Sequence, residues 1–382
     1  MQIGAARNLL NRDTQGGDWS HGSGSSEPVA ILSDGVFLSD GSTLSRIDRD
    51  GHVSWTAEVG ACPSSPAASS EGNAYVVAQG HLKAFDPNGK PLWDAEVGEA
   101  GRPAIGLDDS VYVVAGGRLK AFDRQGLPRF DIRLKPLIEF TGGHRYSDPQ
   151  ITPQGLVVVA SNRRWVKAFH PDGELAWTYK LPSELSAGPS VARDGSLALA
   201  MFPNTVVKLN PEGKELWSTS VGSEAVSMIP LIGLDGAVHA ATTEGELARL
   251  DGQDGHVEQR RRLDADPVGR PDLGPDGSLY VSSYYGVLHR VDPATLATTW
   301  QSDLQIAIGG TSPQVAADGT VYVNRHRYGL LALREQRDEA AKAHERAELA
   351  ARLAAAPEEE APALGRTGDW LVVGGVRVPV KA

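Results

Sequence analysis

The chain has 382 residues, of which 41% are hydrophobic, and a formal net charge of −11. This composition supports a folded core and excludes wholesale disorder, while the single Cys62 excludes an internal disulfide and a multi-cysteine zinc site. The acidic balance argues against a protein that coats nucleic acid. The chain has no run of about 18 apolar residues, so no membrane-spanning helix is predicted.

The first nineteen residues contain no apolar segment of the kind that secretion signals carry. The sequence therefore predicts a cytoplasmic protein, with a periplasmic location only if a leader has been removed.

One phrase recurs along the chain: a proline, a few alternating residues, a glycine turn and an apolar β run. Its clearest copies are SPAASSEGNAYV (65–76), RPDLGPDGSLYV (270–281) and SPQVAADGTVYV (312–323). The eight prolines of the phrase are Pro28, Pro66, Pro103, Pro149, Pro189, Pro230, Pro271 and Pro313. A period of about 40–45 residues with four strands is typical of propeller blades.

A second phrase follows each copy, as in HLKAFDPNGKPLW (81–93): a strand, an Asp-x-x-Gly turn, and a strand that carries a large aromatic residue. Each repeat therefore predicts four short antiparallel strands. We expect the outer aromatic residues to pack between blades, because aromatic side chains dominate buried contact area. They are Trp55, Trp93, Phe130, Trp177, Trp217 and Trp300.

The predicted fold is an all-β, eight-bladed propeller over residues 1–335 with a C-terminal tail. The eighth repeat lacks its last strand, and residues near 8–20, which end in a turn-plus-Trp19 phrase, are expected to supply it. The tail is predicted as a helix over 336–355, a Pro/Glu linker over 356–368 and a β-hairpin over 369–382.

The two phrases resemble the pyrroloquinoline-quinone-type propeller repeat, over about residues 8 to 335. This resemblance implies an eight-bladed ring, and it covers quinoprotein dehydrogenases, outer-membrane assembly lipoproteins and scaffold propellers. The dehydrogenases carry an adjacent-cysteine disulfide and a calcium set, and neither can be placed on this chain. The assembly lipoproteins need an export signal and an N-terminal lipidated cysteine, and Cys62 lies inside the repeats.

Candidate binding residues are those that interrupt the repeat. The residue before each repeat proline should lie at one rim of the central channel, where Arg102, Asp148 and Arg270 could bind an anion or a peptide carboxylate. The alternative is that these charges pair or stay hydrated.

The turns between second and third strands should crowd the same face. They hold Arg163, Arg164 and Trp165, then Tyr284 and Tyr285, then Arg325, His326 and Arg327. Arginine and aromatic residues together are the composition of protein-interaction hot spots. An insertion over 131–147 is expected either at the binding face or as a cover of a neighbouring blade.

Two further motifs are interpreted as structural. The turn DGQDG (251–255) is similar to calcium loops but lacks the EF-hand spacing. Arg260, Arg261 and Arg262 are interpreted as a solvated guard of an outer edge, with a binding site as the alternative.

The sequence thus predicts a bacterial, non-catalytic propeller scaffold that organises a protein assembly, without cofactor, metal or nucleic acid. One protein or peptide partner would bind the turn face, and the C-terminal helix-hairpin with Trp370 would dock a second partner or the protein itself. The alternatives are a quinone-dependent dehydrogenase and an envelope assembly lipoprotein whose leader has been trimmed.

Overall fold

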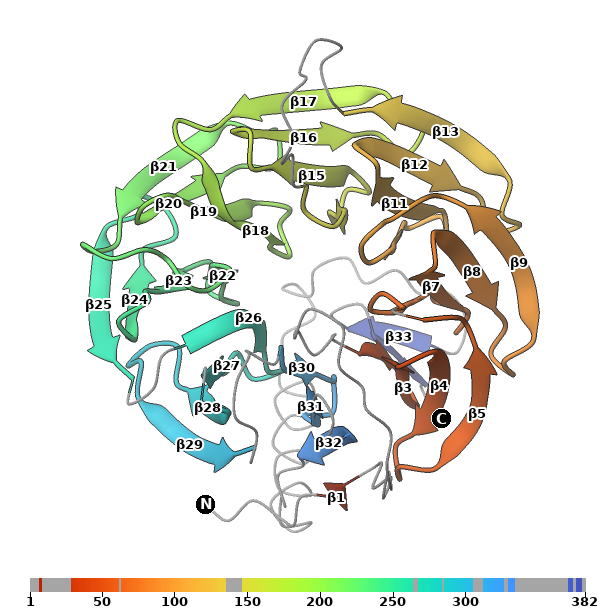
Figure 1. Cartoon of the computed structure of the whole chain (residues 1–382). Helices are drawn as coiled ribbons and strands as arrows, with labels where there is room; N and C mark the ends of the chain where they lie inside the picture. The colour runs from red at the N-terminus through yellow and green to blue at the C-terminus, as the bar shows by residue number, and fades with distance from the viewer. Residues whose placement is uncertain are drawn as a thin grey trace. The chain divides into compact units, whose positions relative to one another are not determined.

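The computed structural model describes residues 7–8, 29–61, 63–134, 146–263, 267–283, 285–304, 312–325, 329–333, 370–373 and 376–379. The chain forms two compact units that divide between Arg334 and Glu335. In the first unit, eight four-stranded antiparallel sheets stand around one axis (Figure 1). The predicted eight-bladed propeller is therefore confirmed.

We number the sheets as blades 1 to 8 and give the strands of each from the axis outward. Blades 1 to 4 are β2 Ala30–Leu32, β3 Gly35–Asp40, β4 Thr43–Asp48 and β5 Val53–Glu58; β6 Ala67–Ala68, β7 Ala74–Ala78, β8 His81–Phe85 and β9 Pro91–Glu96; β10 Ala104–Ile105, β11 Val111–Ala115, β12 Arg118–Phe122 and β13 Pro128–Arg133; β14 Gln150–Ile151, β15 Val157–Ser161, β16 Trp165–Phe169 and β17 Leu175–Lys180.

Blades 5 to 8 follow the same plan, except that the outer strand of blade 8 comes from the start of the chain. They are β18 Leu185–Val191, β19 Leu197–Met201, β20 Thr205–Leu209 and β21 Glu215–Ser220; β22 Leu231–Ile232, β23 Val238–Ala241, β24 Glu246–Leu250 and β25 Val257–Arg262; β26 Pro267–Leu273, β27 Leu279–Ser283, β28 Val287–Val291 and β29 Thr298–Asp303; β30 Gln314–Val315, β31 Val321–Arg325, β32 Gly329–Leu333 and β1 Arg7–Asn8.

The Asp-x-x-Gly turns join the third and fourth strands. In blade 2, Asp86 Oδ1 accepts the N–H groups of Asn88 and Lys90, each at 2.9 Å. Gly89 then adopts a φ of +83°, a conformation that glycine reaches without steric cost. The aspartate and the glycine of the repeat thus define where the outer strand begins.

Most blades contact the next blade through the aromatic residue of the outer strand. Trp177 of blade 4 donates from Nε1 to the carbonyl of Pro211 at 3.0 Å, and its ring lies against Gly213 in the same turn of blade 5. Equivalent bonds run from Trp55 to Pro87, from Trp93 to Arg124 and from Trp217 to Gly252. The prediction that these tryptophans pack between blades is confirmed.

Blade 6 obtains the same bond without an aromatic residue. Gln259 stands in the outer strand opposite Arg249, where other blades carry Trp or Phe. Its Nε2 donates to the carbonyl of Thr295 in blade 7 at 2.9 Å. A donor that reaches the next turn thus recurs at this position in blades 1, 2, 4, 5 and 6, whereas Phe130 of blade 3 offers only its ring.

The N-terminal strand completes the last blade. Strand β1 is antiparallel to β32, with Arg7 opposite Ala332 and Asn8 opposite Leu331. Trp19, which the sequence places in the closing strand, lies outside the described residues, so that part of the prediction stays a prediction.

In the second unit, β33 (Trp370–Val373) and β34 (Val376–Pro379) form an antiparallel pair, with Trp370 opposite Pro379. The helix predicted over 336–355 and the linker predicted over 356–368 lie outside the described residues. Among the residues that the structure describes, no helix is both long and apolar enough to cross a membrane.

Candidate protein-interaction face

The two ends of the propeller differ in the segments that form them. The linker that leads from one blade to the next begins beside the turn between the second and third strands: Val97 N–H donates to Gly80 O at 2.8 Å, and Leu181 N–H to Arg164 O at 2.9 Å. We call this end the linker face. It is the face on which the sequence places its candidate binding residues.

Three of the predicted rim residues lie in a network at the channel. The backbone N–H of Arg102 donates to Asp148 Oδ1 at 3.1 Å, which joins blades 3 and 4. Arg270 of blade 7 donates from Nη2 to Gln150 Oε1 of blade 4 at 3.0 Å, so its side chain crosses the channel. The axis is thus bridged by polar side chains at this level.

Asp272 belongs to the same network, although the sequence did not single it out. Burial raises the pKa of Asp272, and the N–H groups of Leu273 and Val315 and the charges of Arg270 and Arg102 oppose that rise. Val315 N–H lies 2.7 Å from Asp272 Oδ2. A useful signal in the sequence would have been the residue after each repeat proline, because Gln150 and Asp272 both hold that position.

Arg163 and Arg164 lie at the tip of the turn between β15 and β16, and both are exposed. Arg164 has a φ of +65° and donates from Nη1 to the carbonyl of Pro182 at 3.2 Å. Trp165 is half-buried instead. Its ring centroid lies 5.7 Å from that of Tyr146, and Lys167 Nζ lies 4.8 Å from the centroid of the Trp165 ring. The two arginines therefore present charge to solvent, whereas Trp165 mainly supports the turn.

Phe202 is an exposed aromatic residue on the same face that the sequence did not indicate. Its side chain is 55% exposed, and its N–H donates to the carbonyl of Glu184 at 2.8 Å. Since Arg164 binds Pro182 and Phe202 binds Glu184, the two residues flank one short linker. The missed signal is an aromatic residue in the turn between second and third strands of a repeat that lacks arginine there.

Of the other predicted residues, the structure describes Tyr285 and Arg325 in the propeller and Trp370 in the second unit. Tyr285 of blade 7 is 67% exposed. Arg325 and Trp370 are placed only by their backbone, in β31 and β33. Tyr284, His326 and Arg327 lie outside the described residues, as does most of the insertion over 131–147.

A hollow of about 360 Å³ opens beside Asp148 on the linker face. It is lined by Glu99, Gly101, Gly116, Tyr146 and Asp148, among others, so both the linker before blade 3 and the linker before blade 4 contribute. A Cβ at Gly101 would lie 2.1 Å from Asp148 Oδ1, so a larger residue there would displace the Asp148 side chain.

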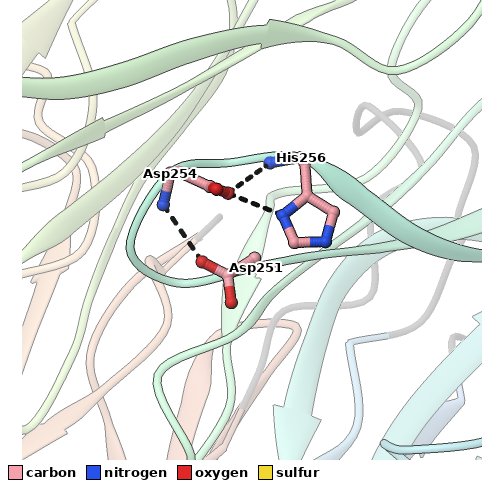
Figure 2. Close-up of side chains that lie close together, drawn as sticks. All are labelled: Asp251, Asp254 and His256. Atoms are coloured by element: carbon pink, nitrogen blue, oxygen red, sulfur yellow. Dashed lines mark hydrogen bonds and ion pairs between the residues drawn. The ribbon is translucent and has the colours of Figure 1, made fainter.

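The acidic turn of blade 6 brings Asp251, Asp254 and His256 together (Figure 2). Asp251 Oδ1 accepts the N–H of Asp254 at 3.0 Å, and Asp254 Oδ1 accepts the N–H of His256 at 3.0 Å and contacts its Nδ1 at 2.7 Å. The Asp254 carboxylate, which accepts a hydrogen bond from the imidazole, raises the pKa of His256. These hydrogen bonds stabilise the turn, and they explain why the three side chains lie close together.

The fold and this face define a class: a propeller of pyrroloquinoline-quinone-type repeats whose polar channel and arginine-bearing turns share one end. The family model described as "Outer membrane protein assembly factor BamB" matches residues 31–135 and 162–268. The chain belongs to this family, and the resemblance seen in the repeats is confirmed.

Comparison with known proteins supports the same assignment. The outer membrane protein assembly factor BamB of Burkholderia pseudomallei (strain K96243) is 34% identical over 128 residues, which are 33% of this chain and 32% of that protein. The match thus spans about a third of the length of that relative.

Two solved structures share the fold. The crystal structure of BamB from Moraxella catarrhalis has a TM-score of 0.65 at 15% identity, covering 88% of this chain and 98% of that one. The computationally designed Ika8 protein has a TM-score of 0.65 at 13% identity, covering 80% and 95%.

The cytoplasmic location predicted from the sequence is wrong. The matched family and relative are described as outer membrane protein assembly factors, which is at odds with a cytoplasmic protein. The error arose because the prediction rested on the composition of residues 1–19 alone, and the repeats carry no information about the compartment.

Proposed function

We propose that this chain is a non-catalytic protein-interaction scaffold that serves the assembly of outer membrane proteins. The observation that carries the proposal is the match of the assembly-factor family to 31–135 and 162–268, which extends over blades from both halves of the ring. The propeller suits this role, because a rigid ring presents turns from many blades on one surface.

The linker face is the proposed partner surface. Arg163, Arg164 and Phe202 combine two guanidinium groups with an exposed ring, the composition that protein interfaces use at their energetic centres. Asp148, Arg102 and Arg270 would add charge at the rim, and Tyr285, Arg325, His326 and Arg327 would extend the contact toward blades 7 and 8. The hollow beside Asp148 supports this choice, since it provides concave surface on the same face.

The tail would supply a second contact. An isolated two-stranded hairpin is only marginally stable in water. The β33–β34 pair with Trp370 is therefore proposed to dock on a second partner or on the protein itself.

Removal of the gene tests the assembly role. We expect the amount of folded outer membrane protein to fall, measured by the heat-dependent gel mobility of an outer membrane β-barrel, and the full chain to restore it. An unchanged amount in the deletion strain would overturn the assembly role, whichever surface the chain uses.

The double variant Arg163→Glu with Arg164→Glu tests the surface. Recovery of the partner in a pull-down is expected to drop about tenfold or more, because reversed charge at a buried contact costs several kcal/mol. Arg193→Glu, an exposed arginine in the turn between the first and second strands, is the matched control and should leave recovery unchanged. Full recovery with the double variant would exclude this patch and leave the assembly role untouched.

A further inference from the structure

The outer strand of blade 6 ends in three exposed arginines. In blades 1, 2, 3 and 7, the fifth residue of the outer strand is half-buried against a neighbouring blade, as Ala57 and Ala95 are. In β25 this residue is Arg261, which is exposed, as are Arg260 and Arg262. Local burial therefore does not explain why this strand carries three cations.

Only one of the three has its charge matched inside the cluster. Arg260 Nη1 donates to Glu246 Oε1 at 2.8 Å and also to the carbonyl of Val221. Arg261, Arg262 and Glu244 complete the lining of a hollow of about 330 Å³ at the outer edge of blade 6. With Arg260 and Glu246 neutralising each other, the remaining lining offers two guanidinium groups and one carboxylate.

We propose that this hollow binds a phosphate ester that carries an ammonium group, as in a phosphoethanolamine headgroup. Arg261 and Arg262 would hold the phosphate, and Glu244 would hold the ammonium. The hollow includes Glu244, in the turn between the second and third strands of blade 6, so it lies at the linker end, but none of the residues named for the partner surface lines it.

The geometry of the strand favours phosphate over carboxylate. Neighbouring residues of a strand leave it on opposite faces of the sheet, and both Arg261 and Arg262 line the hollow at the edge of this strand. A tetrahedral phosphate presents oxygens in several directions, whereas a carboxylate accepts a guanidinium fork in one plane.

The carboxylate of Glu244 favours a zwitterion over a simple anion. An exposed glutamate beside the two arginines repels an anion, and it attracts a ligand that brings its own cation a few bonds away from the phosphate. A trimethylated ammonium cannot donate a hydrogen bond to Glu244, which distinguishes ethanolamine from choline.

Titration calorimetry of the full chain with O-phosphoethanolamine tests the site. We expect binding that weakens by about tenfold or more in Arg261→Gln with Arg262→Gln, since two charge-assisted hydrogen-bonding groups are lost. Arg193→Gln is the matched control for loss of an exposed arginine and should bind as the unaltered chain does. Equal binding by the double variant, with its thermal unfolding unchanged, would overturn the site.

Glu244→Gln tests the zwitterion. Compared with the unaltered chain, this variant should bind O-phosphoethanolamine more weakly. It should bind inorganic phosphate at least as tightly. A gain in affinity for both ligands would overturn the ammonium contact and reduce the site to a simple anion site.

The source of the headgroup is tested with vesicles. Co-sedimentation with phosphatidylethanolamine vesicles that exceeds co-sedimentation with phosphatidylcholine vesicles, and that the double arginine variant loses, would assign the ligand to a lipid surface. Binding of O-phosphoethanolamine without co-sedimentation would overturn the lipid source and assign the site to a soluble phosphate ester.

Discussion

Gly213→Ala is expected to lower the free energy of unfolding by about 2–5 kcal/mol, because two penalties add at this turn. Gly213 has a φ of +75°, which an L-residue adopts only with strain. A Cβ built there would lie 2.3 Å from Cδ2 of Trp177. The side chain would thus push the outer strand of blade 4 away from blade 5. Denaturant unfolding measures the loss.

Gly236→Ala separates the two penalties. Gly236 has a similar φ of +83°, but no heavy atom lies within 4 Å of the Cβ position. Gly236→Ala should therefore lower the free energy of unfolding by only about 1 kcal/mol, which reflects the strained backbone conformation alone. If the two alanine variants lost equal stability, the contact between Trp177 and the turn would not hold the blades together as described.

Stability should fall as the pH drops below about 6.5, and His239 should account for part of the fall. His239 is fully buried in blade 6. Burial lowers its pKa, and the positive charge of Arg249 acts in the same direction, whereas the Pro293 carbonyl and Asp235 oppose them. The folded protein therefore keeps His239 neutral at a pH at which the unfolded chain takes up a proton. The contribution of His239 to the free energy of unfolding is therefore fully present above the pKa that His239 has in the unfolded chain. Below that pKa the contribution is lost, by up to about 1.4 kcal/mol per pH unit.

His239→Tyr is the variant that tests this dependence. Blades 2, 3, 7 and 8 carry Tyr75, Tyr112, Tyr280 and Tyr322 at the matching place. Tyr112 shows that the phenol fits, since its hydroxyl reaches the Pro171 carbonyl at 3.5 Å much as His239 Nε2 reaches Pro293 at 3.0 Å. The free energy of unfolding of the variant should change less between about pH 7 and pH 5 than that of the unaltered chain. Identical slopes for His239→Tyr and the unaltered chain would contradict the assignment.

The repeats predicted the blades because their signals are local. An aspartate that accepts the N–H groups of its own turn, as Asp86 does, and a glycine such as Gly89 act within four residues. Such signals survive in a single sequence, and the period then fixes the number of sheets. The outer tryptophans were predicted for the same reason, since their partner turn recurs in each repeat.

Contacts across the ring could not be predicted in this way. The bond from Arg270 to Gln150 joins residues three blades apart, and nothing in either repeat specifies the other. Phe202 was missed because the sequence does not show that its N–H bonds to the Glu184 carbonyl, which places it beside the same linker as Arg164. Gln259 was missed because a pattern of aromatic residues does not reveal a glutamine with the same donor role.

The pairing of β1 with β32 also determines when the ring can exist. Residues 7 and 8 are synthesised before any blade, but their partners Ala332 and Leu331 are synthesised only after seven blades have been made. During that interval blade 1 has no neighbour on one side. The side chains of Val36 and Ile47, which pack with Tyr322 and Leu330 in the finished ring, stay in contact with water. The chain therefore keeps one apolar face of blade 1 in contact with water until its last repeat has been made.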